Sequence, residues 1–362
     1  MFREFKKIRY LHEFEKVREN NFTIVRFILA YLVLFGHSFP ISGDGRDPVS
    51  ALIVPHAWIG SIAVGGFFAI SGFLVSASIT NRSPIDFAVS RALRLYPAVI
   101  VYSFVAILVI GPMASGVSLK SYFEQNPWVN LWNATLWEWI YNLPFGFPGR
   151  PFAGATNGAT WTLPAELRCY VMVFLLGCVG VFRSRILAGA VIVLIVYIAQ
   201  TDYASLPMFG AEPRFHEPLL FFTAGCMYWI LRRYIPLNWG VCALLLVSTF
   251  GAAGTSVYFY VYIPTVAYCV FMVAYRLPHF DMDRFGDISY GVYIYAWPIQ
   301  QLVWRPGQSG YLNAAYATLI VIPLAYASWK LVESPALKWR NVLGDRVAEF
   351  LLRRPAQATR DA

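Results

Sequence analysis

Charged side chains are scarce in this sequence. Asp, Glu, Lys and Arg make up 14% of the 362 residues, whereas soluble proteins carry about 25%. Hydrophobic residues reach 58% and aromatic residues 17%. This balance excludes an ordinary soluble domain and indicates an integral membrane protein.

Cysteine pairs and common catalytic signatures are also missing. The five cysteines are widely spaced within apolar runs and form no CxxC pair, so neither a disulfide framework nor a zinc site is predicted. There is no GxSxG elbow, HExxH site or GxxxxGK[ST] loop, and no histidine is followed by Asp five positions later. We therefore expect no metal and no tightly bound cofactor. The charged N-terminus predicts no removable signal peptide.

Long apolar runs are abundant instead. A helix needs about 20 mostly apolar residues to cross a bilayer, and we find ten runs that approach this length. They are residues 22–41, 57–79, 95–114, 161–182, 186–200, 216–231, 237–254, 257–275, 286–304 and 311–331. The predicted fold is therefore all-α, a polytopic membrane protein with about ten transmembrane helices.

The basic residues predict how these helices are oriented. If the N-terminus is cytoplasmic, 22 of the 29 Lys and Arg residues fall on inner segments and five on outer segments. This asymmetry predicts that both termini are cytoplasmic. Because the net charge of +9 is spread over every inner loop, it does not favour nucleic-acid binding.

The chain divides into three predicted segments. Residues 1–20 place apolar side chains at helical spacing among charges, which predicts a cytoplasmic amphipathic helix at the membrane interface. Residues 21–335 form the ten-helix membrane domain, and residues 336–362 form a basic cytoplasmic tail. The long outer segment 115–160 is rich in tryptophan, which indicates either an aromatic belt at the lipid headgroups or a platform for a sugar or lipid-linked substrate.

Two polar residues interrupt the first apolar run. Arg26 and His37 are eleven positions apart, so on a helix they share one face and are separated by about 16 Å along the axis. A buried arginine is costly in lipid, and this face should therefore look into protein or a water-filled cavity. The alternative is that Arg26 reaches the inner headgroups and His37 merely caps the outer surface.

A carboxylate in the fourth run is a candidate partner. Glu166 is predicted to lie at about the same depth as His37, so the two side chains could form an acid–base pair. The alternative is that Glu166 neutralises Arg168, two residues further into the membrane.

Six sequence motifs, in order, resemble acyltransferase family 3, a family of membrane proteins that O-acylate extracytoplasmic glycans and related substrates. The resemblance covers about residues 20–340. Its motifs are the Arg26–His37 pair, "GGFFAISGFLVS" from Gly65, "RALRLYP" with Arg91 and Arg94, "TWTLPAEL" with Trp161 and Glu166, "GDISYGVYIYAWPIQQ" and "SWKLVESPALK". Many members have a histidine where this chain has Ala296, which places more of the acid–base work on His37.

The resemblance implies transfer of an acyl group, most commonly acetyl, from cytoplasmic acyl-CoA to a hydroxyl of an extracytoplasmic glycan or lipid-linked oligosaccharide. It also implies a multi-pass protein of the bacterial inner membrane. His37 would be the general base, or would carry the acyl group as an intermediate, and Glu166 would orient it.

The remaining motif residues receive supporting roles. Arg26, Arg91 and Arg94 would bind acyl-CoA, although arginines at an inner helix end also occur merely as topology signals. Ser71, Arg168, Trp161 and Tyr290 would line or support a pore, with helix packing as the alternative. The main rival function is a secondary transporter or flippase for a sugar or small molecule, and a non-catalytic assembly factor is a further alternative.

Overall fold

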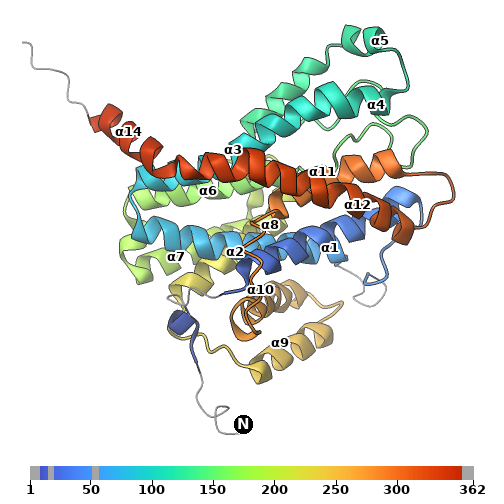
Figure 1. The fold of residues 1–362 in the computed structure, drawn as a ribbon. Coiled ribbons are helices and arrows are strands. Elements are labelled where there is room, and N and C mark those ends of the chain that lie inside the picture. The colour runs from blue at the N-terminus through green and yellow to red at the C-terminus, as the bar shows by residue number, and fades with distance from the viewer. Residues whose placement is uncertain (1–8, 15–19, 51–56, 353–362) are drawn as a thin grey trace, which may run out of the picture.

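A computed structural model of the chain describes residues 9–14, 20–50 and 57–352. Within these ranges every regular element is a helix, apart from an isolated bridge between Tyr10 and Pro236 (Figure 1). The all-α prediction is therefore confirmed. The α-helices are α1 (Phe22–Ser42), α2 (Ile59–Asn81), α3 (Pro84–Val105), α4 (Gly111–Ser115), α5 (Leu119–Glu124), α6 (Thr162–Cys178), α7 (Arg185–Thr201), α8 (His216–Ile230), α9 (Trp239–Gly251), α10 (Tyr258–Arg276), α11 (Ser289–Val303), α12 (Gly310–Ser328), α13 (Ser334–Lys338) and α14 (Arg340–Leu352).

Five helical stretches are long and apolar enough to cross a bilayer. They are Phe22–Ser42, Ile59–Asn81, Pro84–Ser115, Tyr258–Arg276 and Gly310–Val347. Each of the ten predicted runs overlaps a helix, but several of these helices, such as α7 and α9, are shorter. The structure thus supports a membrane protein, while the number of crossings and the cytoplasmic termini stay predictions.

The central helix of the bundle is α2, which packs against α1, α6, α8 and α10. Glycine allows its contact with α8, because a Cβ atom on Gly72 would lie 2.0 Å from the Phe222 carbonyl oxygen. Reciprocally, a Cβ atom on Gly225 would lie 2.1 Å from the Ala69 carbonyl oxygen. Small residues at such contacts let membrane helices approach backbone to backbone.

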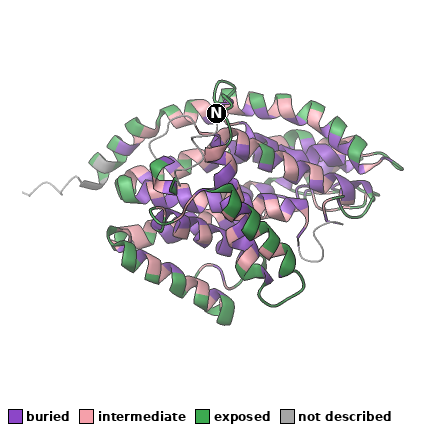
Figure 2. Ribbon diagram, turned by 90° about the horizontal axis from the view of Figure 1, so that it is seen from below, coloured by how far each residue is buried: buried purple, intermediate pink, exposed green. Residues whose placement is uncertain are grey.

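Burial follows the arrangement expected in a bilayer. Buried residues gather in the central helices, and the outer faces of the peripheral helices are exposed (Figure 2). These outer faces carry large apolar side chains, including Leu194 on α7, Leu244 on α9 and Leu319 on α12. Exposed apolar faces of this kind suit contact with lipid rather than water.

The segment before α6, which the sequence predicts to be an outer, non-spanning segment, enters the helix bundle. The buried Asn157 amide donates hydrogen bonds to the Tyr102 hydroxyl at 2.9 Å and to the Ile294 carbonyl of α11 at 2.8 Å. The Trp297 indole, also on α11, donates to the Ala155 carbonyl at 3.0 Å. Irregular backbone can lie at this depth because protein groups satisfy its hydrogen bonds.

The two ends of the chain also differ from expectation. Most of the predicted helix over residues 1–20 lies outside the described residues, and the part within them is a short 3-10 turn, Leu11–Phe14. Leu11 is buried and donates its backbone N–H to the Ile235 carbonyl, so it contacts protein. The predicted boundary at residue 335 falls inside α13, and α14 packs against α3.

Candidate active site

An elongated cavity of about 550 Å³ lies among α1, α2, α3, α6, α11 and the C-terminal helices. Its lining on α2 extends from Val64 to Asn81, seventeen positions along the helix, and continues to Arg82 just beyond the helix end. Seventeen positions correspond to about 26 Å of helix axis, close to the roughly 30 Å thickness of a bilayer's hydrocarbon core.

The chemistry of the lining changes along the cavity. Arg82, Arg91 and Arg340 line one end, which we call the basic end and which the charge pattern predicts to be cytoplasmic. Deeper along α2 the lining is mainly apolar and includes Phe67 and Phe68. The shape therefore suits a long, thin ligand with an anionic head and a less polar arm.

Arg26 and Arg94 both line this cavity, and they share a counterion that sequence reasoning missed. Arg26 Nη1 lies 2.5 Å from Asp287 Oδ2, and Arg94 Nη2 lies 2.9 Å from the same oxygen. Burial alone would raise the pKa of Asp287, but the two guanidiniums and the hydrogen bonds from Ser289 outweigh burial and lower it. Two buried arginines in one stretch of membrane require a carboxylate nearby, and that requirement is the sequence signal that points to Asp287.

Arg94 has a second carboxylate partner, Glu333. Its Nη1 lies 3.6 Å from Glu333 Oε2, and the Ser328 hydroxyl donates to Glu333 Oε1 at 3.1 Å. Glu333 is 2% exposed and ends a π-helical turn, η8 (Trp329–Glu333). Such turns occur frequently at functional sites because they redirect side chains within a helix.

Glu166 lies inside the cavity with Ser71 and Tyr170. The Ser71 hydroxyl donates to Glu166 Oε1 at 3.3 Å, and the Tyr170 hydroxyl donates to the same oxygen. Arg91 lies over the Tyr170 ring at 5.7 Å. The structure thus brings Ser71, Glu166 and Arg91 together at one wall of the cavity.

Arg168 and Glu166, both within the described residues, form no ion pair with each other. Its guanidinium lies over the rings of Trp137 at 4.4 Å and Phe215 at 4.9 Å, and Nη1 donates to the Pro164 carbonyl. Trp161 stacks on the same Phe215, with ring centroids 6.5 Å apart. Arg168 and Trp161 therefore support the wall behind the cavity and do not line it.

His37 lies beyond the deep end of the cavity, which is the end at Val64, opposite the basic end. Its ring contacts those of Trp58 and Trp297, each with a centroid distance of 4.8 Å, and buried Nδ1 makes no hydrogen bond of standard geometry within the described ranges. Along α2 the cavity ends at Val64, about 9 Å short of Trp58. The expected open corridor from Arg26 to His37 is therefore closed at its last part.

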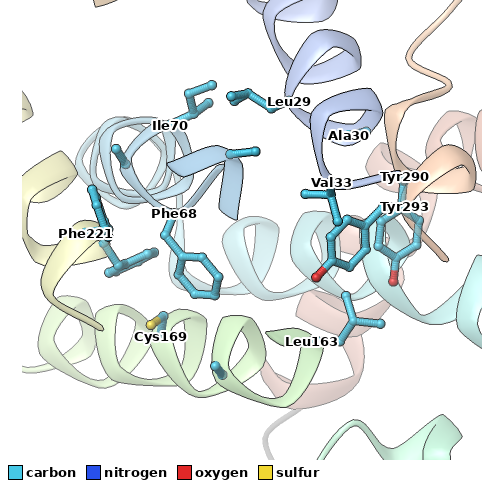
Figure 3. Close-up of a cluster of buried hydrophobic side chains, with 14 of the residues drawn as sticks. Leu29, Ala30, Val33, Phe68, Ile70, Leu163, Cys169, Phe221, Tyr290 and Tyr293 are labelled. Carbon is cyan, nitrogen blue, oxygen red and sulfur yellow. The ribbon is translucent and has the colours of Figure 1, made fainter. Parts of the chain in front are cut away.

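Apolar side chains account for this closure. Between Arg26 and His37 the same face of α1 carries Ala30 and Val33, both fully buried. Val33 faces Tyr290 and Tyr293 of α11 (Figure 3). Tyr290 lines the cavity, and the Tyr293 hydroxyl forms hydrogen bonds with the Thr162 hydroxyl and the Ala159 carbonyl.

The predicted equal depth of Glu166 and His37 is wrong. Glu166 bonds Ser71, which lies thirteen positions after Trp58, the neighbour of His37. Thirteen positions correspond to about 20 Å along α2, so Glu166 and His37 lie too far apart for a hydrogen bond. The difference arises because the segment before α6 enters the bundle, so that α6 begins deeper than its apolar run indicates.

No group of three or more His, Cys, Asp or Glu side chains in the described part of the chain is arranged to hold a metal ion. The polar groups of the cavity are instead guanidiniums, carboxylates and hydroxyls.

Comparison with known proteins identifies the family. A family model described as "Acyltransferase domain", acyltransferase 3, matches residues 19–331. "Nodulation protein 10" of Rhizobium leguminosarum bv. viciae is 28% identical over 92% of this chain and 97% of its own length. The "O-acetyl transferase" of Shigella phage Sf6 is 27% identical over 87% of this chain and 95% of its own length. No solved structure matches. Because the family model covers most of the chain, the protein belongs to the acyltransferase 3 family and is an acyltransferase.

Proposed function

We propose that the protein is a membrane O-acetyltransferase that moves an acetyl group from acetyl-CoA, entering at the basic end, to a hydroxyl of a glycan at the opposite face. The relative named O-acetyl transferase supports the reaction class. The observation that carries the proposal is the elongated cavity, which joins a guanidinium-lined end to an apolar interior over most of a bilayer's thickness.

The donor's chemistry fits this arrangement. Its phosphates cannot enter hydrocarbon without a large desolvation cost, so they should stay at the basic end. Guanidinium groups bind phosphate strongly because they donate charge-assisted hydrogen bonds in a planar fork. The thin acyl-bearing arm would then extend along the cavity past Glu166 toward Val64.

His37 is the proposed general base. In the reaction, the acceptor hydroxyl attacks the thioester carbonyl while His37 takes the hydroxyl proton. The C–S bond then breaks, and the His37 imidazolium returns that proton to the leaving thiolate. A buried amide contacts the residue that follows His37 in the chain, since Gln300 Nε2 donates to Ser38 Oγ at 2.6 Å. The Oε1 atoms of Gln300 and Gln301 are buried without partners in the described part of the chain and could accept hydrogen bonds from glycan hydroxyls.

The closed last part of the cavity adds a requirement to this mechanism. The arm reaches His37 only when the side chains at the deep end, chiefly Tyr293 and Trp58, move apart. Glu166 is too distant to orient His37, so we propose that its carboxylate accepts hydrogen bonds from amide groups of the donor's arm.

The test compares surface-glycan masses in cells that lack the gene with cells that express wild type or His37→Ala. Wild type should add acetyl groups to one glycan. His37→Ala should lower this product by about 100-fold or more, because general-base catalysis contributes on the order of 10²–10⁴, while the variant protein still inserts and binds acetyl-CoA.

Two outcomes would contradict the proposal. Wild-type acetylation by His37→Ala would exclude the histidine as the base. Glycans of identical mass with and without wild-type protein, together with solute uptake independent of acetyl-CoA, would favour a transporter instead.

A further inference from the structure

The arginines at the basic end fall into two sets. Arg26 and Arg94 are neutralised by Asp287, and Arg94 also by Glu333. Arg82, Arg91 and Arg340 line the same cavity, but none of them forms an ion pair with the residues that the structure describes.

The three unpaired arginines come from three separate parts of the chain. Arg82 follows the end of α2, Arg91 lies on α3, and Arg340 begins α14. The pKa of Arg82 is lowered by burial, then by repulsion from Arg340 and Arg91. Attraction to Asp86 does not outweigh this repulsion, so a bound anion would relieve the repulsion that remains.

The position of Arg340 depends on close packing of the C-terminal helix. A Cβ atom on Gly344 would lie 2.7 Å from Asp86 Oδ1, so glycine lets α14 approach the start of α3. Leu337, just before α14, lines the cavity together with Arg340. The segment that the sequence predicts to be a tail thus forms part of the cavity wall.

We propose that Arg82, Arg91 and Arg340 form the phosphate-binding site for the donor, with Arg340 supplied by the C-terminal helix. This inference rests on the proposed function, because it takes the donor to be a coenzyme A thioester. Coenzyme A carries a diphosphate and a separate 3′-phosphate, which match several unpaired guanidiniums. Arg26 and Arg94 instead maintain the fold of the cavity through Asp287.

The test measures binding of coenzyme A and 3′-dephospho-coenzyme A by titration calorimetry. The full chain is placed in phosphatidylcholine nanodiscs, which carry no net charge. Arg82→Gln and Arg340→Gln should each weaken coenzyme A binding by about tenfold, because each removes a charge-assisted hydrogen bond. The preference of wild type for coenzyme A over the dephospho form should also shrink. Arg346→Gln is the matched control, since Arg346 is exposed on α14 and does not line the cavity.

Each outcome bears on a distinct claim. Wild-type affinity in both glutamine variants, with coenzyme A bound by wild type, would overturn the site and leave the proposed function intact. Absence of binding by wild type would overturn the coenzyme A donor and this site with it. If a glutamine variant fails to fold, Arg82→Lys and Arg340→Lys keep the charge and lose the planar fork, so each should weaken coenzyme A binding severalfold. Wild-type affinity in both lysine variants would contradict the site.

An anionic lipid headgroup offers the same phosphate chemistry from another source. Nanodiscs that contain phosphatidylglycerol distinguish the two, with retained lipid measured by native mass spectrometry. Loss of retained phosphatidylglycerol in the variants, with unchanged affinity for coenzyme A, would make the cluster a lipid site and overturn the inference.

Discussion

At the scale of single residues, the basic end of the cavity depends on Asp287. This carboxylate accepts from Arg26 and Arg94 through one oxygen and from Ser289 through the other. Hydropathy places it in the apolar run 286–304 but assigns it no partner, and in the structure it lies just before α11. Its importance comes from the two arginines that three-dimensional folding places beside it.

Removing this charge should destabilise the protein. Asp287→Asn leaves both guanidiniums without their shared carboxylate. It should lower the free energy of unfolding by about 2 kcal/mol. This is less than the roughly 3–5 kcal/mol lost when a fully buried ion pair is broken, because the Asp287 side chain is 15% exposed. Thermal unfolding in detergent measures the loss. Asp281→Asn, at an exposed position of the same loop, should leave the melting temperature unchanged.

The effect should also depend on pH. Because the pKa of Asp287 is lowered in the folded state, its contribution is present above the unfolded value of about 3.9 and is lost as pH falls through the folded pKa. The melting temperatures of wild type and Asp287→Asn should therefore differ at neutral pH and converge below about pH 4. A constant difference down to about pH 3 would contradict the ionic role.

At the scale of elements, the close contact of α2 with α8 holds the cavity wall in place. Gly72 and Gly225 allow backbone approach, and Ser71, beside Gly72, carries the hydrogen bond to Glu166. Packing of the two helices and the position of this polar group are therefore linked.

A single methyl group should disturb this contact. Gly72→Ala places a Cβ atom 2.0 Å from the Phe222 carbonyl oxygen, so α2 and α8 must separate. This separation should lower the free energy of unfolding by about 1–3 kcal/mol. Gly251→Ala is the control, because nothing lies within 4 Å of its added Cβ atom. Equal thermal stability of the two variants would show that α2 and α8 do not pack as closely as described.

The helices themselves were largely predictable, and their relative depth was not. Each apolar run overlaps a helix because a membrane helix must satisfy its own backbone hydrogen bonds and bury apolar side chains. The depth of α6 depends on Asn157 bonding to Ile294, a contact between segments far apart in the sequence. A local pattern cannot contain that contact, and so the pairing of Glu166 with His37 was wrong.

At the scale of the whole molecule, the orientation in the membrane decides what the cavity can bind. If the basic end faces the cytoplasm, as the distribution of Lys and Arg predicts, it faces the compartment that contains acetyl-CoA. The opposite orientation would present the same arginines to the extracytoplasmic space and would contradict the proposed donor.

Cysteine labelling tests this orientation. In a Cys178→Ser background, which removes the exposed native thiol, Lys120→Cys and Arg346→Cys mark the two ends at exposed positions. A membrane-impermeant maleimide added to right-side-out vesicles should label Lys120→Cys at least tenfold more than Arg346→Cys, because only the former should be accessible. Reversed labelling would invert the predicted topology.

The sequence by itself determined the class of this protein. Scarce charge and repeated apolar runs require a membrane environment, and the ordered motifs, Arg26 and His37 among them, indicate the family. Tertiary structure alone decided which charges are neutralised, that a C-terminal arginine joins the cavity, and that Glu166 lies far from His37. The physical reason is that ion pairs and cavities are formed between distant segments, whereas hydropathy and helical spacing describe only neighbours along the chain.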